Sequence, residues 1–236
     1  MNRPPPPDHP PATEPIAAIV MAAGAGSRFG FRPKGLLQRD GEALLARQLR
    51  LLAQAGVSRR VVVLGHHAGD ITALLRKLRA QPAQAGLSWV VNPAPDDGPG
   101  SSLRCGLASL PEDLDGVLVL LGDQPLLEPQ DLRAVLQAWA ERAPGIELVL
   151  PLHAGQPGHP LVFGPQARQA VMAAQGGAGL REWRRAHPEQ VQALPVDHPR
   201  CTTDIDTEAD LATLAAAHGV HLRWPAGPAR DQHRNQ

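Results

Sequence analysis

The sequence has few of the residues on which nucleic-acid binding depends. It contains no tyrosine, and aromatic residues make up only 3% of its 236 residues, so no platform for stacked bases is expected. Lysine plus arginine and aspartate plus glutamate number 23 each, and this balance leaves no basic excess to neutralise phosphates. We therefore expect no nucleic-acid partner.

Cysteine and long apolar runs are equally scarce. Cys105 and Cys201 are far apart in the sequence and show no metal-ligand spacing, so we interpret them as buried, inert thiols. No apolar segment has the length needed to cross a bilayer, and no membrane partner is expected. The apolar run that begins at Ile16 follows prolines and acidic residues, where a secretory signal needs a basic start. The sequence therefore predicts a cytoplasmic protein.

Lysine is scarce as well, because arginine supplies nearly every cation; the only lysines are Lys34 and Lys77. Lys34 ends the stretch IAAIVMAAGAGSRFGFRPK, residues 16–34. The apolar first part of this stretch predicts a strand buried on both faces of a mostly parallel sheet. A compact ammonium is not interchangeable with a planar guanidinium at a crowded phosphate site. The lysine therefore favours a phosphate-binding function for the turn that follows the strand.

Three glycines shape that turn: Gly24, Gly26 and Gly30. Glycine permits positive φ and lets backbone N–H groups approach an anion without a Cβ in between. The spacing G-x-G-x-x-x-G is one residue longer than a dinucleotide fingerprint, and Lys34 is not followed by the Ser or Thr of a P-loop. The sequence thus indicates a different phosphate-binding loop, with Arg28 and Lys34 as its cations. An ordinary tight turn is the alternative.

The rest of the chain alternates between strand and helix patterns. This alternation predicts an α/β fold, a single-domain three-layer sandwich with a mostly parallel, Rossmann-like sheet. We expect the domain to span residues 15–218, between a disordered proline-rich tail, 1–14, and a mobile tail, 219–236. The predicted strands cover residues 60–65, 87–91, 116–124, 146–150 and 191–196, and the predicted helices cover 44–52, 68–79, 101–110, 132–139, 167–174, 180–187 and 204–217.

Polar residues stand at the ends of predicted strands, where ligands bind in open α/β sheets. Asp123 ends an all-apolar strand, although an aspartate that begins a turn before Pro125 is the alternative. Ser101 and Ser102 begin a predicted helix, either as caps or with both hydroxyls facing a nucleotide. These residues are candidates for a site at one edge of the sheet.

Other candidates have simpler alternatives. His66 and His67 follow a strand, but adjacent side chains diverge and no third ligand is suitably spaced, so we expect them at most to line a ligand pocket. The glycine pair at 176–177 is interpreted as a hinge over the acceptor site. Asp206 and Thr207 begin the last helix, where either residue could serve only as a cap.

The stretch MAAGAGSRFGFRPKGLL resembles the signature loop of nucleotidyltransferases that make molybdenum cofactor dinucleotides. Further segments resemble the same family in the same order: GPGSSLRCGL, GDQP, GQPGHPLVF and DIDTEADL. The resemblance extends from about residue 16 to residue 211. It implies a sheet of the nucleotidyltransferase type, and its Ala-Ala-Gly and serine pair resemble the cytidylyltransferase members.

The resemblance implies that a phosphate oxygen of a molybdopterin-type acceptor attacks the α-phosphorus of a nucleoside triphosphate and that pyrophosphate leaves. Arg28, Lys34 and Asp123 would be the catalytic residues. Asp123 and Asp206 would hold Mg²⁺, the expected cofactor, together with substrate phosphates. The residues implied to contact the nucleotide are Ala22, Ala23, Gly24, Ala25, Gly26, Lys34, Ser101 and Ser102.

The resemblance also places Gly158, His159 and Pro160 on the acceptor side. A histidine between glycine and proline either titrates near neutral pH in that site or lies exposed in a turn. CTP is the favoured triphosphate, and a molybdoenzyme that receives the product is a further implied partner.

Two other functions fit the same residues. A sugar-phosphate or other small-molecule-phosphate nucleotidyltransferase would share the loop and the acids and would differ in its acceptor. A non-catalytic nucleotide- or cofactor-binding chaperone for a molybdoenzyme is the second alternative. The presence of both acids and the lysine argues against it, because binding alone does not require a metal site.

Overall fold

The computed structural model of the protein describes residues 16–225. Its centre is strand β1, Ile16–Ala22, which pairs in parallel with β4, Arg59–Leu64, on one side and with β6, Gly116–Leu121, on the other. Most side chains of these three strands are buried. Burial on both faces explains the apolar runs of β1 and β6 and of β4 from Val61 onward.

Within residues 16–225 the main sheet has eight strands, and the predicted mostly parallel arrangement is confirmed. The exceptions are β9, which runs antiparallel between β6 and β7, and β8, which pairs antiparallel with β7. The sequence does not predict either of them, since each is at most three residues long. Across the sheet the order is β10 (Val191–Pro195), β7 (Leu148–His153), β9 (Leu161–Phe163), β6, β1, β4 and β5 (Leu87–Val91), with β8 (Gln156–Pro157) beside β7.

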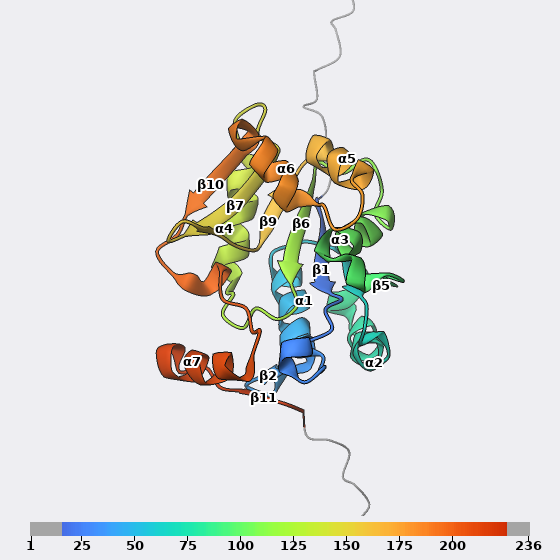
Figure 1. The fold of residues 1–236 in the computed structure, drawn as a ribbon, viewed down its shortest axis with the longest axis vertical. Helices are drawn as coiled ribbons and strands as arrows, with labels where there is room; N and C mark the ends of the chain where they lie inside the picture. The colour runs from blue at the N-terminus through green and yellow to red at the C-terminus, as the bar shows by residue number, and fades with distance from the viewer. Residues whose placement is uncertain (1–15, 226–236) are drawn as a thin grey trace, which may run out of the picture.

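Helices cover both faces of the sheet and complete the three predicted layers (Figure 1). Alternate residues of β1 point to the two faces, since Val20 packs in one apolar cluster and Ile19 in the other. None of the helices in residues 16–225 is long and apolar enough to cross a membrane. One face carries α1 (Leu44–Gln54), α2 (Ala68–Arg79) and α4 (Pro129–Ala140), and the other carries α3 (Pro99–Ala108), α5 (Pro165–Ala173) and α6 (Leu180–Ala186).

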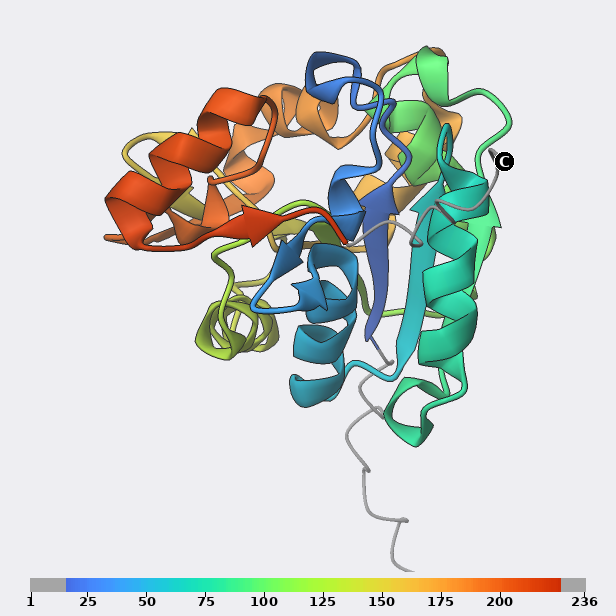
Figure 2. The ribbon, with the colours of Figure 1, turned by 90° about the horizontal axis from the view of Figure 1, so that it is seen from below.

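The C-terminal segment corrects one prediction. Residues 219–225 do not form the expected mobile tail, because β11, Leu222–Arg223, pairs antiparallel with β2, Gln38–Arg39, which in turn pairs with β3, Glu42–Ala43. Figure 2 shows the red β11 beside the blue β2–β3 hairpin. β11 is only two residues long, so the sequence shows no alternating apolar pattern that would predict it. The predicted disordered tail, 1–14, and residues 226–236 lie outside the described residues.

A third apolar cluster explains why the C-terminal segment stays in place. Val220 and Leu222 are buried in it beside Phe29 and Leu37, which come from the glycine-rich loop and its continuation. The ring of Trp224 meets Phe29 edge-on at a centroid distance of 5.8 Å. α7, Glu208–His218, contributes the buried Leu214 to the same cluster. The cluster thus packs α7 against the loop after β1.

Candidate functional site

The loop after β1 has the glycine-dependent shape that the sequence predicts. Gly26 and Gly30 have φ of 63° and 65°, in the left-handed region. The carbonyl of Gly26 accepts the N–H groups of Phe29 and Phe31 at 2.8 and 2.9 Å, which closes the turn. A Cβ on Gly26 would collide with the carbonyl of Arg32, so this position has room only for glycine.

Lys34 lies between two carboxylates that are far apart in the sequence. Its Nζ is 2.7 Å from Asp123 Oδ2 and 3.0 Å from Asp206 Oδ1. Arg28 donates to the other oxygen of Asp206 at 2.7 Å, although the arginine side chain is 67% exposed. The structure therefore brings together all four charged residues that the resemblance singles out.

The electrostatics of the four residues are dominated by this pairing. Burial alone would lower the pKa of Lys34, but the charges and hydrogen bonds of Asp123 and Asp206 outweigh it and raise the pKa above its ordinary value. Lys34 is thus a cation across the physiological range. Asp204 belongs to the same group, since desolvation and the charges of Asp123 and Asp206 raise its pKa. No pattern in the sequence singles out Asp204, although it begins the DIDT segment.

Neighbouring polar groups fix the two aspartates. β6 ends at Leu121, so Asp123 stands in the turn after the strand rather than at its end. Asp206 does not cap α7; Thr207 occupies the cap position, and Asp210 accepts the backbone N–H groups of Asp206 and Thr207 at 2.8 and 2.6 Å. Those hydrogen bonds leave the Asp206 carboxylate free for Lys34 and Arg28.

Two buried glutamines connect the segments that carry the acids. Gln48 of α1 donates to the carbonyl of Gln124 at 2.6 Å, and Gln124, 1% exposed, donates to the carbonyl of Cys201 at 2.9 Å. Arg200 is held by the buried Asp131 of α4 through contacts of 2.8 to 3.2 Å. Sequence reasoning missed these residues, because their importance depends on contacts between distant segments.

The residues present fit a hard divalent cation. Carboxylate oxygens are the ligands that Mg²⁺ and related ions prefer, and one or two carboxylates suffice when substrate phosphates complete the shell. Within residues 16–225 no group of three or more His, Cys, Asp or Glu side chains is placed to hold a metal by itself. Asp123 and Asp206 are thus suited to a metal that arrives with a phosphate ligand.

The serine pair at the start of α3 has a structural partner that the sequence did not reveal. Gly98 is the cap position of α3, so the expectation that the serines cap this helix is wrong. Both hydroxyls accept hydrogen bonds from the side-chain amide of Asn92, at 3.1 Å for Ser101 and 3.0 Å for Ser102. Ser102 is only 3% exposed and Asn92 4%, so Ser102 holds the end of β5 to α3, and Ser101 is the serine nearer the surface.

The two histidines after β4 form hydrogen bonds to neighbouring loops. His67 donates from Nε2 to the carbonyl of Ala25 at 2.9 Å, within the glycine-rich loop. His66 Nε2 is 3.0 Å from the carboxylate of Asp96. The glycine-rich loop is therefore held at Ala25 against the start of α2, at the edge of the sheet where ligands of parallel sheets bind.

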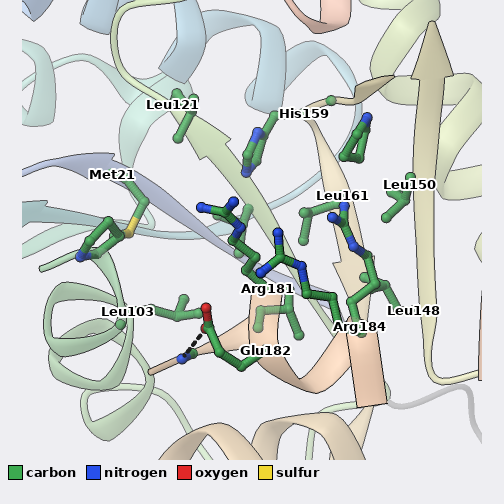
Figure 3. Close-up of a pocket in the computed structure, with 18 of the residues that line it drawn as sticks. Met21, Leu103, Leu121, Leu148, Leu150, His159, Leu161, Arg181, Glu182 and Arg184 are labelled. Atoms are coloured by element: carbon green, nitrogen blue, oxygen red, sulfur yellow. Dashed lines mark hydrogen bonds between the residues drawn. The ribbon is translucent and has the colours of Figure 1, made fainter. Parts of the chain in front are cut away.

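A cavity lies on the opposite side of β6 from the α1 layer, between the sheet and α6 (Figure 3). Its volume is about 690 Å³, and Gly158 and His159 line it. Burial, together with the nearby charge of Arg184, lowers the pKa of His159 to about 4. Both earlier expectations for this histidine are therefore wrong: it neither titrates near neutral pH nor lies exposed in a turn. Pro160, joined to it by a cis peptide bond, is buried behind the cavity wall and does not line it.

The loop that carries the glycine pair packs against the start of α3. Arg104 donates to the carbonyls of Gly176 and Ala178, the latter at 2.7 Å. A Cβ on Gly100 would collide with the carbonyls of Gly177 and Ala178. The backbone of residues 177–178 therefore contacts the backbone at the start of α3. The proposed hinge at 176–177 stays a prediction.

Comparison with known proteins adds the family. A family model described as the MobA-like NTP transferase domain matches residues 18–193. The chain belongs to this family. The matched range contains most of β1, the glycine-rich loop, Lys34 and Asp123, whereas Asp204 and Asp206 follow it.

Solved structures and curated proteins are also similar to the chain. Rv0371c from Mycobacterium tuberculosis H37Rv is 28% identical, with a TM-score of 0.66 over 87% of this chain and 100% of that chain. The same protein in complex with manganese is 26% identical, with a TM-score of 0.66 over 86% of this chain and 99% of that chain. The bifunctional protein GlmU from Mycobacterium marinum is 35% identical over 126 residues, 51% of this chain and 25% of that protein. The chain thus spans about a quarter of the length of the curated relatives it matches.

Proposed function

We propose that the protein is a nucleotidyltransferase that joins a nucleoside monophosphate, from CTP by preference, to the phosphate of a molybdopterin-type acceptor and releases pyrophosphate. The observation that carries the proposal is the position of Lys34, 2.7 Å from Asp123 and 3.0 Å from Asp206 beside the glycine-rich loop. Family membership supports the transfer of a nucleotidyl group. The acceptor and the choice of CTP rest on the resemblance of the motifs, and a molybdoenzyme is the proposed recipient of the product.

The reaction is an in-line displacement in which positioning and charge neutralisation do most of the work. An oxygen of the acceptor phosphate forms a bond to the α-phosphorus, while the bond from this phosphorus to the bridging oxygen breaks and pyrophosphate leaves. Arg28 and Lys34 would neutralise the triphosphate. The backbone of Ala22, Ala23, Gly24, Ala25 and Gly26 would contact phosphates and base, together with Ser101; Ser102 would act through Asn92.

A divalent cation fits the same place, with Mg²⁺ as the proposed ion. Asp123 and Asp206 would hold it, and Asp204 is near enough to influence it. Bound there, the cation would neutralise charge on the phosphate oxygens. The manganese complex of the similar Mycobacterium tuberculosis protein supports the proposal of a divalent metal. Without substrate, Lys34 compensates the two carboxylates, and triphosphate binding would draw the lysine toward phosphate oxygens.

Pyrophosphate release tests the proposal directly. Purified protein is incubated with Mg²⁺, a molybdopterin-type acceptor and either CTP or GTP, and pyrophosphate and the dinucleotide are measured. We expect product with CTP and, because a wrong base leaves buried polar groups unpaired, a preference of about two orders of magnitude over GTP. Equal turnover with GTP would reject the CTP assignment. Turnover only with sugar phosphates would reject the acceptor, and nucleotide binding without pyrophosphate release would favour the chaperone alternative.

A further inference from the structure

Each of the four charged residues of the candidate site stands within three residues of a buried member of the third apolar cluster. None of these four cluster members is more than 6% exposed. Because close-packed side chains leave little room for movement, the packing of this cluster constrains where the four charged groups lie. The pairs are Arg28 with Phe29, Lys34 with Leu37, Asp123 with Leu126, and Asp206 with Ile205.

The C-terminal strap, residues 220–224, completes this cluster. Val220 and Leu222 are buried in the cluster, and Trp224 packs against it. Strand β11 within the strap pairs with β2, which follows Lys34 along the chain (Figure 2). The strap therefore joins a segment near the end of the described chain to the glycine-rich loop and its continuation.

The ring of Trp224 contacts the glycine-rich loop at two residues. It meets Phe29 edge-on at a centroid distance of 5.8 Å, and the guanidinium carbon of Arg32 lies 3.5 Å from its centroid. Edge-on aromatic pairs and cations over an indole face are both favoured by the charge distribution of the ring. Arg32 makes no ion pair within residues 16–225, so this stack is the contact that fixes its side chain.

The loop between these two contacts has a conformation that must be held. Phe31 has a φ of 54°, in the left-handed region that bulky side chains rarely adopt, and it is 69% exposed. Its own side chain therefore gains little packing to offset the strain. A strained backbone persists only where the surrounding structure determines it. The contacts of Trp224 at Phe29 and Arg32, on either side of Phe31, supply this constraint.

We propose that the C-terminal strap is a positioning element of the nucleotide site and that Trp224 is its main positioning residue. Through its contacts at Phe29 and Arg32, the ring keeps the loop in the shape that presents both loop cations to a triphosphate. The term nucleotide site rests on the proposed function. Trp224 acts through the loop and not on the substrate, so its loss reduces the fraction of the free protein that is ready to bind.

Hydrogen exchange measures the hold on the loop without any substrate. The N–H groups of Phe29 and Phe31 both donate to the carbonyl of Gly26, so both exchange when the loop opens. In Trp224→Ala these two amides should exchange at least about fivefold faster than in the wild type, because the strain at Phe31 then favours open conformations. Arg32→Ala removes only the stack and should give a smaller increase, about twofold.

Two further variants separate positioning from a general loss of packing. Trp224→Phe keeps an aromatic edge and face, so it should restore most of the protection of the loop amides. Trp89→Ala is the matched control, because Trp89 also lies under an arginine, with Arg79 at 4.8 Å, but belongs to β5 at the edge of the sheet. It should leave exchange in the loop unchanged. Melting temperatures check that every variant folds, and Arg32→Ala changes only an exposed side chain.

Titration with CTP and Mg²⁺ connects the loop to the nucleotide. Trp224→Ala should raise the Kd and the KM for CTP about fivefold, whereas kcat at saturating CTP should stay within about twofold, because bound triphosphate restores the loop. Unchanged loop exchange in both Trp224→Ala and Arg32→Ala would overturn the inference. So would faster exchange with an unchanged Kd, or a fall in kcat alone.

The proposed function can fail separately from this inference. If the wild type binds no CTP and yet Trp224→Ala exchanges its loop amides faster, the nucleotide assignment is wrong and the hold on the loop remains. If the wild type releases pyrophosphate from CTP and the Trp224 and Arg32 variants match it in exchange and Kd, nucleotidyl transfer remains and the role of the strap is wrong.

Discussion

The protein has two groups of cations beside the ends of its central strands, and they differ in how their charge is balanced. Lys34 is enclosed by two carboxylates within 3.0 Å. Arg181, Arg184 and Arg185 meet no carboxylate within residues 16–225 and line the cavity together with leucines of β7 and β9. The first arrangement suits a site that holds metal and phosphates together, because acids and cations are both needed there. The second belongs to the cavity on the proposed acceptor side, which neither Asp123 nor Asp206 lines.

The largest effect should come from the acid nearest Lys34. Asp123→Asn keeps the size of the side chain and removes one anionic ligand, so turnover should fall at least about a hundredfold, since charge neutralisation by a metal contributes several kcal/mol to barrier lowering. Pyrophosphate release across a Mg²⁺ titration measures this, and Asp113→Asn, at an exposed aspartate, is the control. If the Asp123→Asn protein keeps its normal rate and metal dependence, Asp123 serves only to form the turn.

Lys34→Arg tests whether the first site needs a compact ammonium. The Nζ contacts both acids at a side-chain exposure of only 17%, so a guanidinium must displace at least one of them. Turnover should fall to below about a tenth, because misplacement of catalytic groups by an ångström is costly. Lys77→Arg replaces the only other lysine, which is exposed on α2, and should keep full activity. Near-normal turnover in Lys34→Arg would show that Lys34 acts only as a solvated charge.

The sequence predicts the first site better than the second for a physical reason. A glycine-rich turn after a buried strand is a local pattern, and both the strand Ile16–Ala22 and the left-handed Gly26 are where the pattern predicts them. The helix Ala68–Arg79 and the strand Leu87–Val91 have the predicted bounds, since their apolar periodicity and end signals are local too.

Features that depend on distant contacts could not be predicted in this way. The pairing of β11 with β2 depends on the burial of Leu222 beside Phe29 and Leu37. A strand of two residues is too short to show a pattern that predicts this pairing. The role of Asn92 as the partner of the serine pair requires β5 and α3 to meet. The arginines of α6 look in sequence like an ordinary charged helix face, and only the fold turns Arg184 toward the cavity.

A milder effect should separate the two acids of the first site. Asp206→Asn retains an oxygen ligand, and Lys34 keeps Asp123, so turnover should fall by about tenfold or less, as expected when one of several ligands is weakened. Arg28 would lose a partner with little consequence, because its side chain is 67% exposed and such pairs contribute little. Initial rates at saturating Mg²⁺ measure the effect. A larger loss in Asp204→Asn than in Asp206→Asn would assign the second carboxylate to Asp204 instead.

The smallest effect concerns the neutral histidine of the cavity and appears in stability rather than in activity. Burial and Arg184 lower the pKa of His159 to about 4, whereas an unfolded histidine titrates near about 6.5. Between these values the unfolded chain binds more protons than the folded one, so stability falls as pH decreases from 6.5 to 4.

His159→Asn removes this contribution and retains a polar side chain of similar reach. Relative to its own value at pH 7, the wild type at pH 5 should lose roughly 1 to 2 kcal/mol more than the variant in free energy of unfolding, because each pKa unit corresponds to about 1.4 kcal/mol. Urea unfolding at pH 7, 6 and 5 measures the difference. Carboxylates that titrate in the same range affect both proteins alike and cancel in the comparison. Parallel pH dependences would mean that His159 is solvated in the folded protein and that burial does not lower its pKa.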